Sequence, residues 1–340
     1  MAKTRLYPSH RSFVANERLQ RELSVKLQAL EQLLNESLDS DTPLVPLIGT
    51  HILRGGGKRI RPLLLILTAR ASGYNGSEEV RLASLTEWIH AATLLHDDVL
   101  DEADLRRDQP TVRRTWGNRL SVYMGDYAYF YSVTGLLRMA NAALASCLLQ
   151  ACEHMVLGEL MQLEQGNKPS ESGYLRIIEY KTGALMAATC QAGGILADAA
   201  KADCQALYRF GLALGIAFQL LDDAQDYVSS AEFGKRPGQD LRHGVVTLPL
   251  LHLLRHCTEH ERKELHDFLL TKARPEEAFD SISRLLVHYG SITHTFALVH
   301  RYRDVAKSHL EGLKDSIYKD GLLAFADSVL LKEARFDQSH

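Results

Sequence analysis

Apolar residues recur at helical spacing through most of the 340-residue chain, and almost no stretch alternates with the period of a strand. Residues 16–38 show the pattern best, because Leu19, Leu23, Leu27, Leu30 and Leu34 share one stripe with charged residues behind it. A spacing of three or four residues places side chains on one face of an α-helix. The periodicity therefore predicts an all-α fold.

Similar patterns predict further helices, separated by segments rich in proline and glycine. They cover residues 62–72, 78–103, 119–139, 142–165, 172–199, 203–228, 246–256, 259–272, 276–289, 291–313 and 319–334. No linker is long enough to separate two domains. We expect a single-domain bundle of about a dozen helices over residues 1–340, with residues 1–44 as an N-terminal helical extension packed on it.

Composition excludes several classes of protein. A formal net charge of −3 offers no field that would gather nucleic acid or an anionic membrane. The five cysteines are scattered without a CxxC pair, which argues against a disulfide framework or a zinc knuckle. Neither a signal segment nor a long uncharged apolar run is visible. We expect a cytoplasmic protein with no nucleic-acid partner and no stable membrane anchor.

The segment LLHDDVLDEADLRRD at residues 94–108 concentrates acidic side chains behind an apolar run. Asp97 and Asp101 lie four apart, so their carboxylates share a helix face, with Asp98 close by. His90, seven residues before Asp97, falls on the same face. Like charges at this spacing repel, so a cation is expected there; a solvated acidic face is the ordinary alternative.

A second cluster of the same DDxxD form follows at residues 218–226, with Asp222, Asp223 and Asp226 behind another apolar run. Two carboxylate faces pointing at one cavity would repel strongly without a cation. Oxygen ligands with room for water suit Mg²⁺, which shares its remaining positions with substrate phosphates. The two clusters together therefore predict a Mg²⁺ site of up to six acids.

Basic residues that could hold phosphates accompany these clusters. The turn GGGKRIRP at residues 55–62 joins three glycines to a basic run before a helix, although it lacks the spacing of an ATP-type P-loop. Arg106 and Arg107 close the first acidic segment, where pairing with Asp101 or Glu102 is the simpler role. The further candidates are Lys58, Arg59, Arg61, Lys181, Thr182 and Lys235.

Taken in order, these motifs resemble the trans-isoprenyl diphosphate synthases, or polyprenyl synthetases. They are GGGKRIRP, HxxxxxxDDxxD followed by two arginines, KTG, and FQLLDDxxD with its TLPLL sequence. The resemblance runs from about residue 45 to the C-terminus. It implies the isoprenoid synthase fold, an all-α bundle around a central cavity, usually as a homodimer. It also implies a prenyltransferase that condenses isopentenyl diphosphate with an allylic diphosphate.

The resemblance assigns roles by position. It implies that Asp97, Asp101, Asp222 and Asp226 ligate Mg²⁺ on the allylic diphosphate, with Asp98 and Asp223 supporting them. The isopentenyl diphosphate pocket matches Lys58, Arg61, His90 and Arg107. Contacts to the allylic diphosphate match Arg106, Lys181, Thr182, Gln219 and Lys235. The residues expected to carry catalysis are Asp97, Asp101, Lys181, Asp222 and Asp226.

One position departs from the family pattern. The loop after the second acidic motif usually reads DLxxGKxTLPL, but here Val245 replaces the lysine. One cation that would neutralise diphosphate is therefore missing. Turnover could be reduced, or the chain could be a non-catalytic subunit of a heteromeric synthase.

Product length is predicted from the residues upstream of Asp97. Ala92 and Thr93 are small where short-chain relatives tend to carry a large aromatic residue, which favours a long-chain product of the quinone side-chain class. The alternative is a farnesyl or geranylgeranyl diphosphate synthase. A terpene cyclase is disfavoured, because Asp222 and Asp226 complete a second DDxxD motif.

Overall fold

The computed structural model describes residues 16–54, 57–107, 109–165, 170–227, 238, 240–241, 245–270 and 276–328. Helices cover nearly all of these residues, which confirms the all-α prediction. The described chain divides into two compact units. The first unit consists of the described residues up to Cys152, together with Ala187–Arg209 and His309–Ser328. The second unit consists of Glu153–Met186 and Phe210–Ser308. The expectation of one domain with an N-terminal extension stays a prediction.

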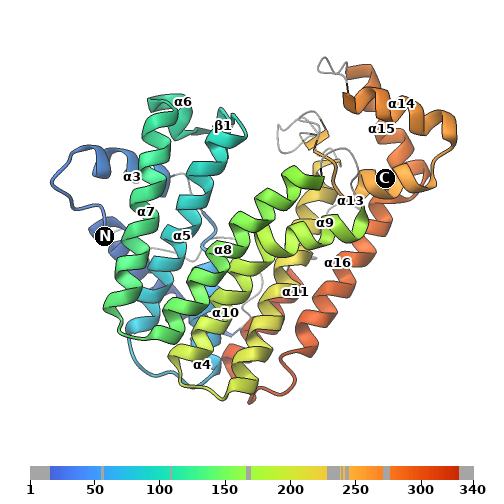
Figure 1. The fold of residues 1–340 in the computed structure, drawn as a ribbon. Coiled ribbons are helices and arrows are strands. Elements are labelled where there is room, and N and C mark those ends of the chain that lie inside the picture. The colour runs from blue at the N-terminus through green and yellow to red at the C-terminus, as the bar shows by residue number, and fades with distance from the viewer. Residues whose placement is uncertain are drawn as a thin grey trace. The chain divides into compact units, whose positions relative to one another are not determined.

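In the first unit α5 and α7 pack along each other over most of their length (Figure 1). Helix α2 packs on α5, helix α17 packs on α4, and α2 and α17 also contact each other. The helices of this unit are α2 (Glu17–Glu36), α3 (Leu44–Arg54), α4 (Ile60–Ala71), α5 (Glu78–Leu100), α6 (Val112–Trp116), α7 (Asn118–Arg138) and α17 (Ile317–Ser328). A two-residue antiparallel hairpin of β1 (Leu105–Arg106) and β2 (Gln109–Pro110) follows the acidic end of α5.

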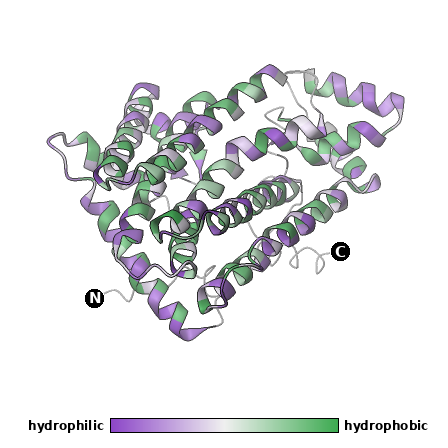
Figure 2. Cartoon of the chain, turned by 60° about the horizontal axis from the view of Figure 1, so that its bottom comes forward, coloured by the Kyte–Doolittle hydropathy of each residue, from purple (hydrophilic) through white to green (hydrophobic). Residues whose placement is uncertain are grey.

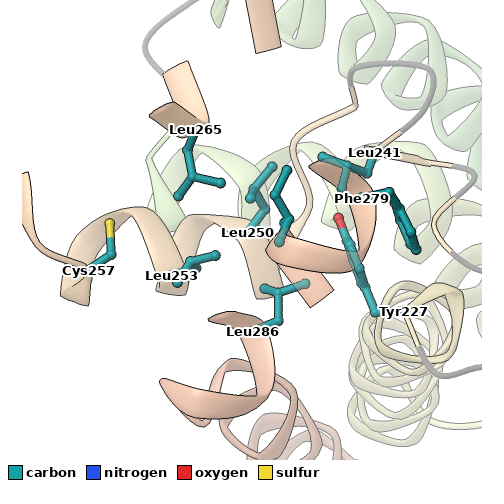
Figure 3. Packing of buried hydrophobic residues seen from close by; sticks show 9 residues of the cluster. Tyr227, Leu241, Leu250, Leu253, Cys257, Leu265, Phe279 and Leu286 are labelled. Carbon is teal, nitrogen blue, oxygen red and sulfur yellow. The ribbon is translucent and has the colours of Figure 1, made fainter. Parts of the chain in front are cut away.

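The second unit is built around α13, which packs on α16, α15 and α9. Figure 3 shows its apolar core, in which Leu250 and Leu253 of α13 meet Leu286, Phe279 and Tyr227. The elements of this unit are α9 (Glu171–Ile178), the π-helix η1 (Glu179–Gly183), α13 (Leu248–His256), α14 (Glu259–Leu270), α15 (Glu276–His288) and α16 (Ser291–Ser308). Helices α8 (Ala142–Gln165), α10 (Ala184–Leu196) and α11 (Lys201–Asp226) have residues in both units.

The amphipathic pattern that predicted these helices is visible along them in Figure 2. All five leucines of the α2 stripe are buried, and the Asn16 side chain caps the helix by accepting from the backbone N–H groups of Arg18 and Leu19. Helix α11 is long and apolar enough to cross a membrane by composition, but 61% of its apolar window is buried inside the protein. That burial is typical of a core helix.

Several local predictions were incomplete. Helix α3 was missed because Pro46 suggested a loop, yet it lies in the first turn, where a helix needs no N–H donor. Pro62 likewise lies inside the first turn of α4, which begins at Ile60. The helix expected at 172–199 is interrupted by the π-helix η1. Helix α6 and the small hairpin were also not predicted.

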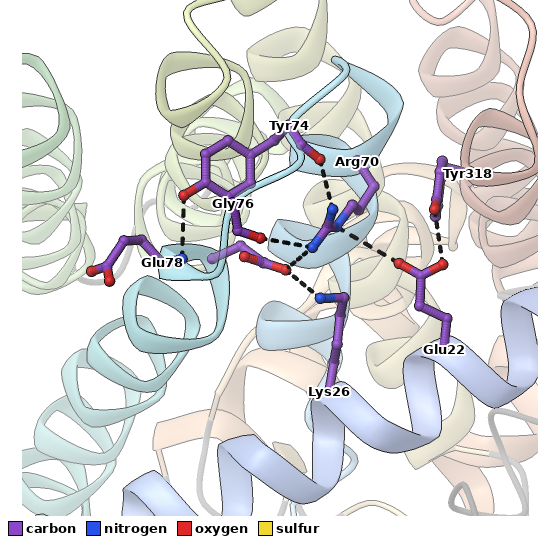
Figure 4. Close-up of polar contacts among 8 residues, drawn as sticks. Glu22, Lys26, Arg70, Tyr74, Gly76, Glu78 and Tyr318 are labelled. Carbon is purple, nitrogen blue, oxygen red and sulfur yellow. Dashed lines mark hydrogen bonds and ion pairs between the residues drawn. The ribbon is translucent and has the colours of Figure 1, made fainter.

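A buried ionic network ties four helices of the first unit together (Figure 4). Glu79, at the start of α5, is fully buried and accepts from Lys26 of α2 and Arg70 of α4, both at 2.5 Å. Burial alone would raise the pKa of Glu79, but the bonds from Lys26 and Arg70 outweigh it and lower that pKa. Glu22 of α2 accepts from the Tyr318 hydroxyl of α17 at 2.8 Å and lies 3.7 Å from Arg70.

Three imidazole rings stack in the second unit. His252 of α13 lies 4.1 Å from His256 and 4.3 Å from His294 of α16, measured between ring centroids. Its Nδ1 is 3.0 Å from the Ser291 hydroxyl. Burial, followed by the neighbouring His294 and His256, lowers the pKa of His252 to about 4. The stack therefore favours neutral imidazole at its centre.

We expect Glu79→Gln to lower the free energy of unfolding by about 3–5 kcal/mol, because it removes the fully buried carboxylate that two partly buried cations share. Urea denaturation at neutral pH measures the change. The matched control is Glu78→Gln on the same turn, whose side chain is half-exposed and 3.7 Å from Arg81. That change should cost under about 1 kcal/mol. Equal effects of the two substitutions would contradict the structural role of Glu79.

We expect acid to destabilise the chain partly through His252. An unfolded histidine titrates near pH 6.5, whereas the folded pKa of His252 is about 4. The unfolded chain therefore binds the extra proton first, and the contribution to stability, complete above about pH 6.5, is lost as pH falls toward 4. His252→Asn should reduce the loss of stability between pH 7.5 and pH 5.0 in urea titrations. His260→Asn, at an exposed position of α14, should leave that loss unchanged.

Candidate active site

The first acidic motif lies at the C-terminal end of α5. The helix ends at Leu100, and Asp101 is its C-cap, with its N–H donating to the Asp97 carbonyl at 2.8 Å. Asp97 is half-buried and Asp101 is exposed. The two side chains therefore remain one helical turn apart, as the spacing predicted.

Asp98, between them, is buried and bonded to the protein. Its carboxylate accepts from Nε of Arg106 in β1 at 2.8 Å, which fastens the hairpin to the end of α5. Burial raises the pKa of Asp98, Arg106 opposes that rise, and nearby Asp101 adds to it. Arg106 thus pairs with Asp98 rather than with Asp101 or Glu102.

A cationic cluster formed by Arg59, Arg61 and Arg107 lies in the same unit, with His90 next to it. Nε of Arg61 is buried and has no hydrogen-bond partner among the described residues. Burial lowers the pKa of both Arg61 and Arg107. Burial and the surrounding arginines, Arg61 first, hold the pKa of His90 well below its usual range, so His90 is neutral at pH 7. Lys58 is exposed beside the cluster.

Such a cluster can hold an anion. A Cβ atom at Gly57 would lie 3.2 Å from Nη1 of Arg59 and 3.3 Å from Nη1 of Arg107, so this glycine lets backbone and guanidinium groups approach closely. Desolvated, planar guanidinium groups beside a glycine turn can donate in pairs to the oxygens of a phosphate. The structure therefore brings Arg61, His90 and Arg107 together, as the isopentenyl diphosphate prediction requires.

Arg59 differs from its neighbours because protein carboxylates already engage it. It caps α4 in the left-handed conformation, with φ 48°, and donates to Glu31 of α2 and Glu87 of α5, each at 2.7 Å. Burial would lower the pKa of Arg59, but these two acids raise it above its ordinary value. Arg59 therefore has a structural role.

The second acidic motif ends α11, in the second unit. Asp223 is buried and accepts from the Tyr174 hydroxyl of α9 and from Nε2 of Gln219, the latter at 2.9 Å. Gln219 also accepts from the Thr182 hydroxyl at 2.9 Å. A continuous hydrogen-bond chain therefore joins the KTG triplet of η1 to the aspartates of α11.

Glycines set the spacing of these elements. A Cβ at Gly215 of α11 would lie 2.8 Å from Cα of Gly183 in η1, and one at Gly158 of α8 would lie 2.7 Å from Cγ of Lys181. The π-helix widens the backbone at this contact, as π-bulges at functional sites often do. Nζ of Lys181 donates to Gln162 at 2.7 Å and lies 2.9 Å from Glu159, both in α8.

A fourth aspartate joins the second motif. The Asp240 N–H donates to Oδ2 of Asp226 at 2.9 Å. Burial, then the charges of Asp226 and Asp222, raises the pKa of Asp240 to about 7. Burial, then Asp240 and Asp226, raises the pKa of Asp223 well above its usual range. The sequence prediction left Asp240 out of the site, although it is the first residue of the DLxxG signal.

The donors at both helix ends suit a hard divalent cation, because they are carboxylates that raise one another's pKa. Across the described ranges, no three acidic, histidine or cysteine side chains lie close enough to enclose an ion by themselves. An ion held here would take few protein ligands and complete its shell with water or phosphate. The convergence of both motifs on one cavity stays a prediction, as do the assigned ligands.

Two further positions concern the loop after α11. Lys235 lies outside the described residues. Val245 is exposed, and its N–H donates to the Asp240 carbonyl at 2.8 Å.

Known proteins are similar to this chain in sequence and in fold. The model of the family described as Polyprenyl synthetase matches residues 43–286. The octaprenyl diphosphate synthase of Haemophilus influenzae is 36% identical over 303 residues, covering 88% of this chain and 92% of its own. A decaprenyl diphosphate synthase from Rhodobacter capsulatus superposes with a TM-score of 0.88 at 35% identity, covering 93% of this chain and 98% of its own.

A polyprenyl synthase from Caulobacter crescentus, complexed with calcium and isoprenyl diphosphate, superposes with a TM-score of 0.87 at 32% identity. It covers 92% of this chain and 97% of its own. The chain belongs to the polyprenyl synthetase family. The predicted prenyltransferase with the all-α isoprenoid synthase fold is thereby confirmed.

Proposed function

We propose that this chain condenses isopentenyl diphosphate with an allylic diphosphate to make a long-chain all-trans polyprenyl diphosphate, with Mg²⁺ as its metal. One repeated arrangement carries the proposal. In both DDxxD motifs the middle aspartate, Asp98 or Asp223, is buried and bonded to the protein, whereas one outer aspartate is exposed and the other half-buried. In each motif the buried middle aspartate therefore holds the helix end in place, and the two outer carboxylates remain accessible.

Separate groups of residues bind the two diphosphate substrates. Arg61, Arg107 and Lys58 bind isopentenyl diphosphate, and neutral His90 contributes hydrogen bonding without adding charge. Lys181 leaves Glu159 to meet the allylic diphosphate, whose leaving group gains negative charge as its C–O bond breaks. Mg²⁺ held by Asp97, Asp101, Asp222 and Asp226 would stabilise that charge. The isopentenyl double bond then attacks the allylic cation, and the departing diphosphate takes up the released proton.

A long product is supported by the small residues on α5. Ala92 is buried, and the Thr93 hydroxyl is turned back onto the His90 carbonyl at 2.8 Å. A chain growing along α5 from Asp97 would meet no large side chain at these two positions. Relatives that make octaprenyl and decaprenyl diphosphates favour the same product class.

The proposal includes a cytoplasmic homodimer that acts without a stable membrane anchor. Exposed apolar side chains recur every seven residues along α7, at Tyr123, Phe130 and Leu137, and would suit burial against a second copy. A non-catalytic subunit is the competing proposal, because Val245 stands where the family usually has lysine. The purified chain alone, given both substrates and Mg²⁺, separates the two, since a non-catalytic subunit would yield no product.

We expect the purified chain to make polyprenyl diphosphates from isopentenyl diphosphate and farnesyl diphosphate, with activity lost on chelation and restored by Mg²⁺. Asp97→Asn and Asp222→Asn should each reduce kcat by about a hundredfold or more, because each removes a charged metal ligand. Asp104→Asn is the matched control, since Asp104 belongs to the same acidic segment but pairs with Arg113 at 2.8 Å. Full activity in both site variants would contradict the proposed metal site.

We expect Ala92→Phe to shorten the product distribution, because an aromatic ring would obstruct the path along α5. Products extracted and sized by chromatography measure the change. Ala91→Phe, at the neighbouring buried position, controls for the effect of crowding on stability. An unchanged chain length in active Ala92→Phe enzyme would contradict the proposed path.

A further inference from the structure

Glu87 is a buried carboxylate within the cationic cluster of the first unit. It lies on α5, three residues before His90, and is 7% exposed. Its Oε1 accepts from Nη1 of Arg59 at 2.7 Å. None of the sequence motifs includes this residue.

Two further guanidinium groups are influenced by the same carboxylate. A Cβ at Gly57 would lie 3.3 Å from both Oε1 of Glu87 and Nη1 of Arg107, so the two side chains approach the same point, and the charge of Glu87 acts on Arg107. The charge of Glu87 also acts on Arg61, where it opposes the effect of burial. Glu87 is thus the carboxylate that Arg59, Arg61 and Arg107 have in common.

We infer that Glu87 is a positioning residue for the isopentenyl diphosphate site. Desolvated guanidinium groups repel one another, and the charges of Arg61 and Arg107 work against each other. A buried anion among them holds these side chains together before the substrate arrives, so less ordering is needed on binding. The inference rests on the proposed function, because it takes Arg61 and Arg107 as residues that bind isopentenyl diphosphate.

Whether removal of the Glu87 charge strengthens or weakens diphosphate binding distinguishes a positioning role from a purely electrostatic one. A carboxylate near an anion site also reduces the local positive potential, which by itself weakens anion binding. If the arginines kept their places without Glu87, the diphosphate would bind more tightly. If Glu87 holds them in place, its removal weakens binding.

The chain provides a matched control in Glu31. This residue of α2 accepts from Arg59 at 2.7 and 3.2 Å. Unlike Glu87, it does not affect the pKa of Arg61 or Arg107. Glu31→Gln and Glu87→Gln therefore both weaken the anchoring of Arg59. Only the second removes the charge that faces Arg61 and Arg107.

The test measures the Kd of isopentenyl diphosphate by calorimetry on the full chain, with steady-state kinetics alongside. Glu87→Gln should weaken binding by about tenfold or more, raising KM for isopentenyl diphosphate while KM for the allylic substrate and kcat stay near wild type. Glu31→Gln should leave Kd within about twofold of wild type. Glu87→Asp, which keeps the charge, should recover part of the affinity.

Two results would overturn the inference. One is isopentenyl diphosphate binding by Glu87→Gln that equals or exceeds wild type; the other is equal weakening by Glu31→Gln. If Glu87→Gln fails to fold, Glu87→Asp is measured in its place. A Kd for isopentenyl diphosphate equal to that of the wild type in Glu87→Asp would then overturn the inference. Failure of the proposed function itself is distinguishable, because the wild-type chain would then neither bind isopentenyl diphosphate nor form product.

Discussion

Both acidic motifs depend on a buried middle aspartate that is bonded to its own unit. Asp98 is held by Arg106, and Asp223 is held by Tyr174 and Gln219. A buried carboxylate is costly unless hydrogen bonds compensate it. These bonds fix the rotation of each helix end about its axis, which sets the face from which the outer aspartates project. The DDxxD spacing therefore serves two purposes. The middle aspartate fixes the helix end, and the two outer aspartates remain available to bind a metal ion.

In the second unit, the backbones of η1 and α11 must approach each other closely. Gly183 and Gly215 let η1 and α11 pack with almost no side chain between them. That approach allows Thr182 to reach Gln219, which in turn bonds Asp223. The KTG triplet and the second acidic motif lie almost forty residues apart in sequence, yet they form one hydrogen-bonded assembly. A Cβ at Gly215 would lie 2.8 Å from Cα of Gly183, so a side chain there would push the two elements apart.

Much of this arrangement could be predicted from the sequence. The leucine stripe of α2 and the apolar faces of α5 and α11 specify helices, because burial of one face follows directly from a period near 3.6 residues. The acidic motifs and KTG are also visible as patterns. Helix α3 was not, since Pro46 is read as a breaker until its place in the first turn is known. The interruption by η1 has no signal in hydrophobic periodicity.

The different roles of neighbouring residues depend on contacts distant in sequence. Arg59 and Arg61 stand two positions apart in the same basic turn, yet Arg59 is bonded to Glu31 and Glu87 whereas Nε of Arg61 has no partner among the described residues. The family resemblance selected Arg61 by position, but the residue types in GGGKRIRP do not explain the choice, because the difference lies in which carboxylates of α2 and α5 reach each guanidinium. A basic turn shows that an anion can bind; the buried acids around it decide which arginines remain available to bind it.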